Sequence, residues 1–94
     1  MRVICADNEK FALDILERAV REAAPDAEIR SCLKVSEVLH AVREENFYPE
    51  VAFLDIEMPG MTGLELAVEL KKTLPDINIV FVTGYSEYAL EAMR

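Results

Sequence analysis

The chain has 94 residues, of which 52% are hydrophobic, and a formal net charge of −8 at pH 7. This length allows a single domain, residues 1–94, with enough apolar side chains for a packed core, and no apolar run is long enough to cross a membrane. The acidic balance argues against direct nucleic-acid binding by this segment, and without a signal peptide we expect a cytoplasmic location.

The first half of the sequence predicts two strands, each followed by a helix. Arg2–Ala6 is a short apolar strand that ends at Asp7 and Asn8, and Asn8 is a candidate cap for the helix over residues 9–24. The apolar residues of that helix recur at helical spacing and are Ala12, Ile15, Leu16, Ala19 and Ala23.

A second strand is predicted over residues 27–33, with Ile29 and Cys32 as its buried positions. It is the most polar of the predicted strands, as expected at the edge of a sheet. Val35, Val38 and Val42 then mark an amphipathic helix that ends near residue 46.

The third strand is a run of four apolar residues, Val51–Leu54, without polar alternation, which is typical of a strand buried on both faces of a parallel sheet. The run stops at Asp55 and a tight loop follows. Thr62 and Glu65 have the spacing of a capping box, which predicts a helix from about Gly63 to Thr73.

The last strand, residues 77–83, is the most apolar and ends at Thr83; Ser86 can cap a further helix. Strands alternate with helices throughout. This order predicts an α/β fold with a doubly wound parallel sheet in the strand order 2-1-3-4.

Three other residues, Cys5, Cys32 and His40, could carry chemistry. Cys5 and Cys32 lack Cys-x-x-Cys spacing, so buried reduced thiols are favoured over a disulfide. His40 has no metal-ligand spacing to either cysteine, and we expect it at a partly exposed helix position without a chemical role.

Polar groups end three of the four predicted strands: Asp7 with Asn8, Asp55, and Thr83. In the order 2-1-3-4 the first and third strands are neighbours, so Asp7 and Asp55 converge at the edge where ligands bind in open α/β sheets. Two carboxylates in one cleft repel unless a proton or a cation lies between them, and hard oxygen donors suit Mg²⁺. Each acid could instead have only a local structural role, ending a strand or capping a helix.

Three motifs carry a resemblance to a known family. They are the segments Cys5-Ala6-Asp7-Asn8-Glu9, Phe53-Leu54-Asp55-Ile56-Glu57-Met58-Pro59-Gly60-Met61-Thr62-Gly63 and Phe81-Val82-Thr83-Gly84-Tyr85. Together they resemble the response-regulator receiver domain of two-component signalling, a flavodoxin-like fold. The stretch from Thr83 to Ala92 is similar to receivers attached to LytTR-type DNA-binding output domains, which implies regulation of transcription by a part beyond this chain.

The resemblance implies a role for each matching position. Asp55 would accept a phosphoryl group from a sensor histidine kinase, in a Mg²⁺-dependent reaction, and Thr83 would be the switch hydroxyl. Asp7, Asn8, Asp55 and the backbone carbonyl of Glu57 would be the metal ligands. The domain would act as a phosphoprotein switch and not as an enzyme.

The sequence departs from the family at two places. The second residue of the usual acidic pair is Asn8, which brings an amide oxygen but no charge. The family's lysine, fifth strand and fifth helix are not in the sequence, so the chain looks like a receiver truncated at Arg94. The strand at residues 77–82 then becomes an exposed apolar edge, so we expect an isolated monomer to be unstable or prone to aggregation. If the chain is well folded, we expect a homodimer through this edge.

Two alternatives remain open at this stage. A phosphorylation-independent binding module with receiver architecture is favoured by Asn8 and by the missing lysine. A haloacid-dehalogenase-like phosphatase needs a second aspartate two residues after its nucleophile, but Glu57 occupies that position and Pro59 follows it.

Overall fold

The computed structural model of the chain describes residues 1–82. Strands and helices alternate in it, in the chain order β1 (Arg2–Ala6), α1 (Lys10–Ala23), β2 (Glu28–Cys32), α2 (Val35–Arg43), β3 (Val51–Leu54), α3 (Gly63–Thr73) and β4 (Asn78–Phe81). Within these residues the strands form one parallel sheet in the order β2-β1-β3-β4, which confirms the predicted topology. None of the helices in this range is long and apolar enough to cross a membrane.

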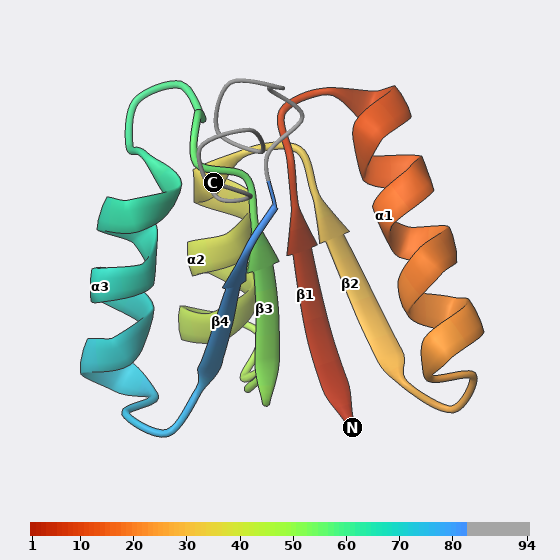
Figure 1. Cartoon of the computed structure of the whole chain (residues 1–94). Helices are drawn as coiled ribbons and strands as arrows, with labels where there is room; N and C mark the ends of the chain where they lie inside the picture. Colours follow the sequence, from red (N-terminus) through yellow and green to blue (C-terminus); the bar gives the residue numbers. More distant parts are fainter. Residues whose placement is uncertain (83–94) are drawn as a thin grey trace, which may run out of the picture.

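The sheet separates two clusters of buried side chains. α2 and α3 pack on one face over Ile4, Ala52 and Leu54, and α1 packs on the other face over Val3 and Cys5 (Figure 1). Cys5 and Cys32 are both buried, but they belong to the two different clusters. Because the two thiols lie on opposite faces of the sheet, the prediction of reduced buried cysteines is confirmed.

Helix α1 differs from the prediction in its start and in its buried face. Asn8 does not cap it, and the helix begins after Glu9 without a side-chain cap. The Asp7 carboxylate instead accepts a 2.9 Å hydrogen bond from the Glu9 N–H. The buried positions are Leu13 and Val20, whereas Ile15 is 53% exposed. The apolar face of α1 predicted from the sequence is therefore wider than the face that packs against the sheet.

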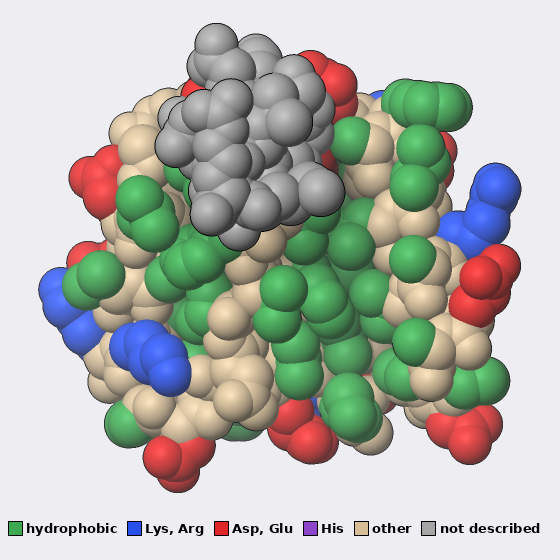
Figure 2. Space-filling view, in the orientation of Figure 1, with side chains coloured by type: hydrophobic (Ala, Val, Ile, Leu, Met, Phe, Trp, Pro, Cys, Tyr) green, Lys and Arg blue, Asp and Glu red, His purple; other side chains and the backbone are tan. Residues whose placement is uncertain are grey.

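The α1 side of the sheet is only partly covered. Val51 and Phe53 are half-buried, so the prediction that β3 is buried on both faces is wrong. A hollow of about 260 Å³ lies between α1 and β3, and its lining includes Val3, Leu16 and Phe53. Figure 2 shows hydrophobic side chains gathered over this part of the sheet, beside α1.

Strand β4 is an edge of the sheet within the described residues. It is shorter than predicted, and Val80 and Phe81 are each 41% exposed. The N–H groups of Asn78 and Val82 donate to carbonyls on the β3 side, at Glu50 and Leu54. Because hydrogen-bonding direction alternates along a strand, the backbone groups of residues 79 and 81 point away from β3.

Candidate functional site

Asp7 and Asp55 stand side by side at the carboxyl edge of the sheet. β1 and β3 are parallel neighbours with Ala6 opposite Leu54, so the residue after each strand continues the same register. The Asp55 N–H donates to the Ala6 carbonyl at 2.9 Å, and the Asp7 N–H donates to the Cys32 carbonyl at 3.1 Å. The strand ends therefore hold both aspartates at one place, as the sequence predicts.

Both carboxylates are largely removed from solvent. Asp7 is 6% exposed and Asp55 is 8% exposed, and they are the buried charged residues of the described chain. Burial, and then the negative charge of Asp7, raise the pKa of Asp55. The backbone N–H groups of Glu57 and Ile56 act in the opposite direction, since they donate toward the carboxylate.

The loop after Asp55 is fixed by the start of α3. Thr62 and Glu65 form the predicted capping box: the Glu65 N–H donates to Thr62 Oγ1 at 3.1 Å, and the Thr62 N–H donates to Glu65 Oε1 at 3.1 Å. The Gly63 N–H also donates to the Ile56 carbonyl at 2.8 Å. This set of bonds holds the helix start against the segment that follows Asp55.

Gly63 has a positioning role that the sequence interpretation missed. A Cβ atom at this position would overlap the backbone carbonyl oxygen of Asp55 and lie 2.9 Å from its carbonyl carbon. The available signal was a glycine as the first helical residue, directly after the Thr62 cap, where the helix itself does not require one. Its absent side chain lets α3 approach the backbone of the candidate phosphoacceptor.

The remaining predicted site residues lie around this pair. Asn8 is exposed in the turn after Asp7, where it lines a hollow of about 550 Å³ together with Lys34 and Pro59. Glu57 is exposed, and its N–H donates to Asp55 Oδ1 at 3.3 Å. Thr83 lies outside the described residues.

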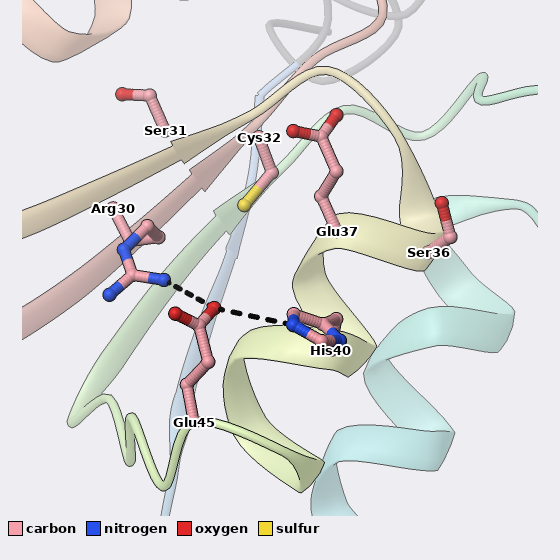
Figure 3. Close-up of a pocket in the computed structure, with 7 residues that line it drawn as sticks. All are labelled: Arg30, Ser31, Cys32, Ser36, Glu37, His40 and Glu45. Carbon is pink, nitrogen blue, oxygen red and sulfur yellow. Dashed lines mark hydrogen bonds and ion pairs between the residues drawn. The ribbon is translucent and has the colours of Figure 1, made fainter.

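His40 lies at a different hollow, of about 400 Å³, between β2 and α2. Its side chain is exposed, and its Nε2 atom is 3.9 Å from a Glu45 carboxylate oxygen, which also accepts a 2.8 Å hydrogen bond from Arg30 (Figure 3). The hollow lies along α2 and away from Asp55, so His40 is not part of the acidic site. The expectation that His40 has no chemical role remains a prediction.

The donor set at the acidic pair fits a hard divalent cation. Asp7 and Asp55 are buried carboxylates of like charge, and Asp7 is close enough to raise the pKa of Asp55; an amide side chain lies in the adjoining turn. Among residues 1–82 no three His, Cys, Asp or Glu side chains are grouped as a metal site, and the buried carboxylates of this range are those of Asp7 and Asp55. Mg²⁺ is typically held by one or two carboxylates and keeps several waters.

Comparison with known proteins agrees with this geometry. Residues 3–94 match the family model described as the response regulator receiver domain. The chain belongs to this family. It is 39% identical to an uncharacterized response regulatory protein of Yersinia pestis and 30% identical to the sensory transduction protein LytT of Bacillus subtilis, in each case over 100% of this chain. The receiver spans 38% of the length of either relative.

Solved receiver structures resemble it as well. A CheY-like receiver domain protein of Methanospirillum hungatei superimposes with a TM-score of 0.77 at 27% identity, over 97% of this chain and 74% of that one. The response regulator TrrA of Thermotoga maritima, solved in complex with Mg²⁺ and BeF, gives a TM-score of 0.76 at 32% identity, over 93% and 72% of the two chains. This receiver is therefore short in comparison with those structures.

Proposed function

We propose that this receiver takes a phosphoryl group from a sensor histidine kinase onto Asp55 and acts as a switch, not as an enzyme with its own substrate. The observation that carries the proposal is the buried pair of Asp7 and Asp55 at the carboxyl ends of adjacent parallel strands. The family membership and the Mg²⁺ complex of the related TrrA structure support it.

The chemistry requires the Asp55 carboxylate to be ionised and oriented. One carboxylate oxygen attacks the phosphorus of a phosphohistidine, the phosphorus–nitrogen bond breaks, and the released imidazole takes up a proton. The Glu57 N–H donates to Asp55 Oδ1 and so helps to orient the carboxylate. A bound Mg²⁺ would neutralise charge on the incoming phosphoryl group, with Asp7, Asn8, Asp55 and the Glu57 carbonyl as its proposed ligands.

The partner must reach the same edge of the sheet. Helix α1 begins beside the acidic pair and exposes two large apolar side chains one turn apart, Phe11 at 78% and Ile15 at 53%. Exposed apolar side chains that adjoin a reactive site are typical of a protein-binding surface. We propose that a histidine kinase approaches along α1, in the cytoplasm, and that Thr83 responds to the phosphoryl group as the switch hydroxyl.

Our proposal for the output function is based on the relatives of this receiver. Because the receiver spans only 38% of LytT, the remainder of such a protein would carry the effector, which for a LytTR-type regulator is a DNA-binding domain that regulates transcription. The acidic receiver itself does not bind nucleic acid in this proposal. A phosphorylation-independent binding module is the second candidate, and the neutral Asn8 is the observation that favours it.

Intact-mass measurement tests the proposal. The receiver, both as these 94 residues and with any sequence that continues it, is incubated with phosphoramidate in Mg²⁺ or in EDTA. We expect one phosphoryl group per chain in Mg²⁺ only, none in Asp55→Asn, and normal uptake in the exposed control Asp76→Asn. Equal uptake by Asp55→Asn would contradict the proposal, and no uptake by any form would favour the binding module.

A further inference from the structure

A hollow of about 550 Å³ lies where three segments that follow strand ends meet. It is lined by Asn8 from the turn after β1, by residues 33–36 from the connection between β2 and α2, and by Pro59 from the loop after β3. Asn8 directly follows Asp7, and the Asp7 N–H donates to the Cys32 carbonyl at the end of β2. The hollow therefore adjoins the acidic pair at the carboxyl edge of the sheet.

Lys34 is the charged side chain among the described residues that line this hollow. It is exposed, and its ammonium group has no ion pair or hydrogen bond within residues 1–82. The nearby Glu37 carboxylate accepts the Leu33 N–H at 3.2 Å instead. The other lysines all have partners, which are Asp14 for Lys10, the Ile77 carbonyl for Lys71 and Glu69 for Lys72. Lys34 therefore places an unpaired positive charge beside two buried carboxylates.

An incoming phosphodonor meets unfavourable charge at this site. The chain has a formal net charge of −8, and the carboxylates of Asp7 and Asp55 repel any anion that approaches them. A fixed cation at the entrance to such a site reduces the repulsion and raises the local concentration of anions. Because this effect is electrostatic, it grows with the charge of the donor and weakens as salt is added. Lys34 is placed to act in this way on a donor that enters the hollow.

We propose that Lys34 is a specificity-determining residue of the phosphotransfer, which attracts the more highly charged phosphodonors into the hollow beside the acidic pair. The inference rests on the proposed phosphorylation of Asp55 and adds the residue that selects the donor. In the transfer itself an Asp55 carboxylate oxygen forms a bond to phosphorus, the bond from phosphorus to the leaving group breaks, and the leaving group keeps the electron pair. Lys34 exchanges no proton in this step and acts before it, through its charge.

Two small donors of different charge test this role at pH 7, in low salt and excess Mg²⁺. Acetyl phosphate is a dianion and releases acetate, whereas phosphoramidate carries one net negative charge and releases ammonia. Intact-mass time courses give the phosphorylation rate per donor concentration for each. Lys34→Gln should lower this rate by about 2- to 4-fold with acetyl phosphate and by less with phosphoramidate, while Lys34→Arg should retain both rates. The difference should vanish in roughly 1 M NaCl, where charges are screened within about 3 Å.

Lys10→Gln is the matched control, because Lys10 also follows the turn after β1, as the first residue of α1, but its charge is paired with Asp14. It should leave both rates nearly unchanged. Two results would overturn the inference: an unchanged rate for Lys34→Gln with acetyl phosphate, or an equal loss with both donors. In either case the unaltered chain is still phosphorylated at Asp55, so only the inference fails. If the unaltered chain accepts no phosphoryl group from either donor, the inference and the proposed function fail together.

Discussion

Gly63, the first residue of α3, lies directly against the backbone carbonyl of Asp55. A Cβ atom there would overlap the carbonyl oxygen, and the Gly63 N–H is already bonded to the Ile56 carbonyl at 2.8 Å. The start of the helix therefore packs tightly against the backbone of the candidate phosphoacceptor.

Replacing Gly63 by alanine tests this packing. Alanine in a helix is normally better than glycine by up to about 1 kcal/mol, but the overlap with Asp55 should outweigh this gain and lower the free energy of unfolding by about 1–3 kcal/mol. Urea unfolding measures the change. Leu64→Ala is the control, because Leu64 is the next residue of α3 and its side chain is 53% exposed. A Gly63→Ala variant as stable as the parent would contradict the predicted overlap.

The raised pKa of Asp55 makes folding stability depend on pH. Burial and the charge of Asp7 disfavour the ionised form in the folded state, so this carboxyl favours folding at low pH and that contribution is lost as pH rises through its folded pKa. Without metal at pH 7.5, Asp55→Asn should raise the melting temperature by roughly 4–8 °C, which corresponds to about 1 kcal/mol. The difference should disappear in acid, where Asp55 is neutral.

Thermal unfolding in EDTA across this pH range measures the effect. The exposed control Asp76→Asn should show little change at any pH. A lower melting temperature for Asp55→Asn at pH 7.5 would show that the ionised carboxylate is stabilised in the folded receiver.

The two thiols should be inert in the folded protein. Burial raises the pKa of Cys5 to about 11 and that of Cys32 to about 12, so little thiolate forms near neutral pH. We expect Ellman's reagent at pH 8 to modify neither thiol in native protein and both in guanidinium chloride. Rapid modification of either thiol without denaturant would contradict the described burial.

The exposed edge of β4 should pair with a second copy of the chain, so the protein should self-associate. Its outward backbone groups at residues 79 and 81 have no partner strand within residues 1–82, and the strand carries no charge. We expect the mass from light scattering to rise with concentration toward a dimer, and Phe81→Lys to reduce this. Phe11→Lys, at an exposed apolar residue of α1, is the control. A monomer at all concentrations would contradict the expected homodimer.

The sequence predicted the features that depend on local chemistry and strand order. The convergence of Asp7 and Asp55 follows from alternating elements and a parallel sheet, and the capping box follows from Thr62 and Glu65 alone. Both signals act over a few residues or follow from a general topological rule. They do not depend on which side chains meet across the core.

The incorrect predictions have two physical causes. Neighbouring residues compete for the same backbone hydrogen bond, and the burial of a strand depends on elements distant in the sequence. Asn8 could cap α1, but the Asp7 carboxylate bonds the Glu9 N–H. The run at β3 suggested burial on both faces, yet Phe53 is only half-buried beside α1. The contact between Gly63 and Asp55 also depends on three-dimensional packing, which a single sequence does not show.

The assignment of Asp55 as the phosphoacceptor is tested most directly by chemical mapping of the phosphoryl group. After reaction with phosphoramidate and Mg²⁺, borodeuteride reduces an aspartyl phosphate to deuterated homoserine, which peptide mass spectrometry locates in the sequence. We predict the label at Asp55, and its loss when Mg²⁺ is replaced by EDTA. A label at Asp7 or at another acidic residue, with Asp55 unchanged, would contradict the assignment of Asp55 as the phosphoacceptor.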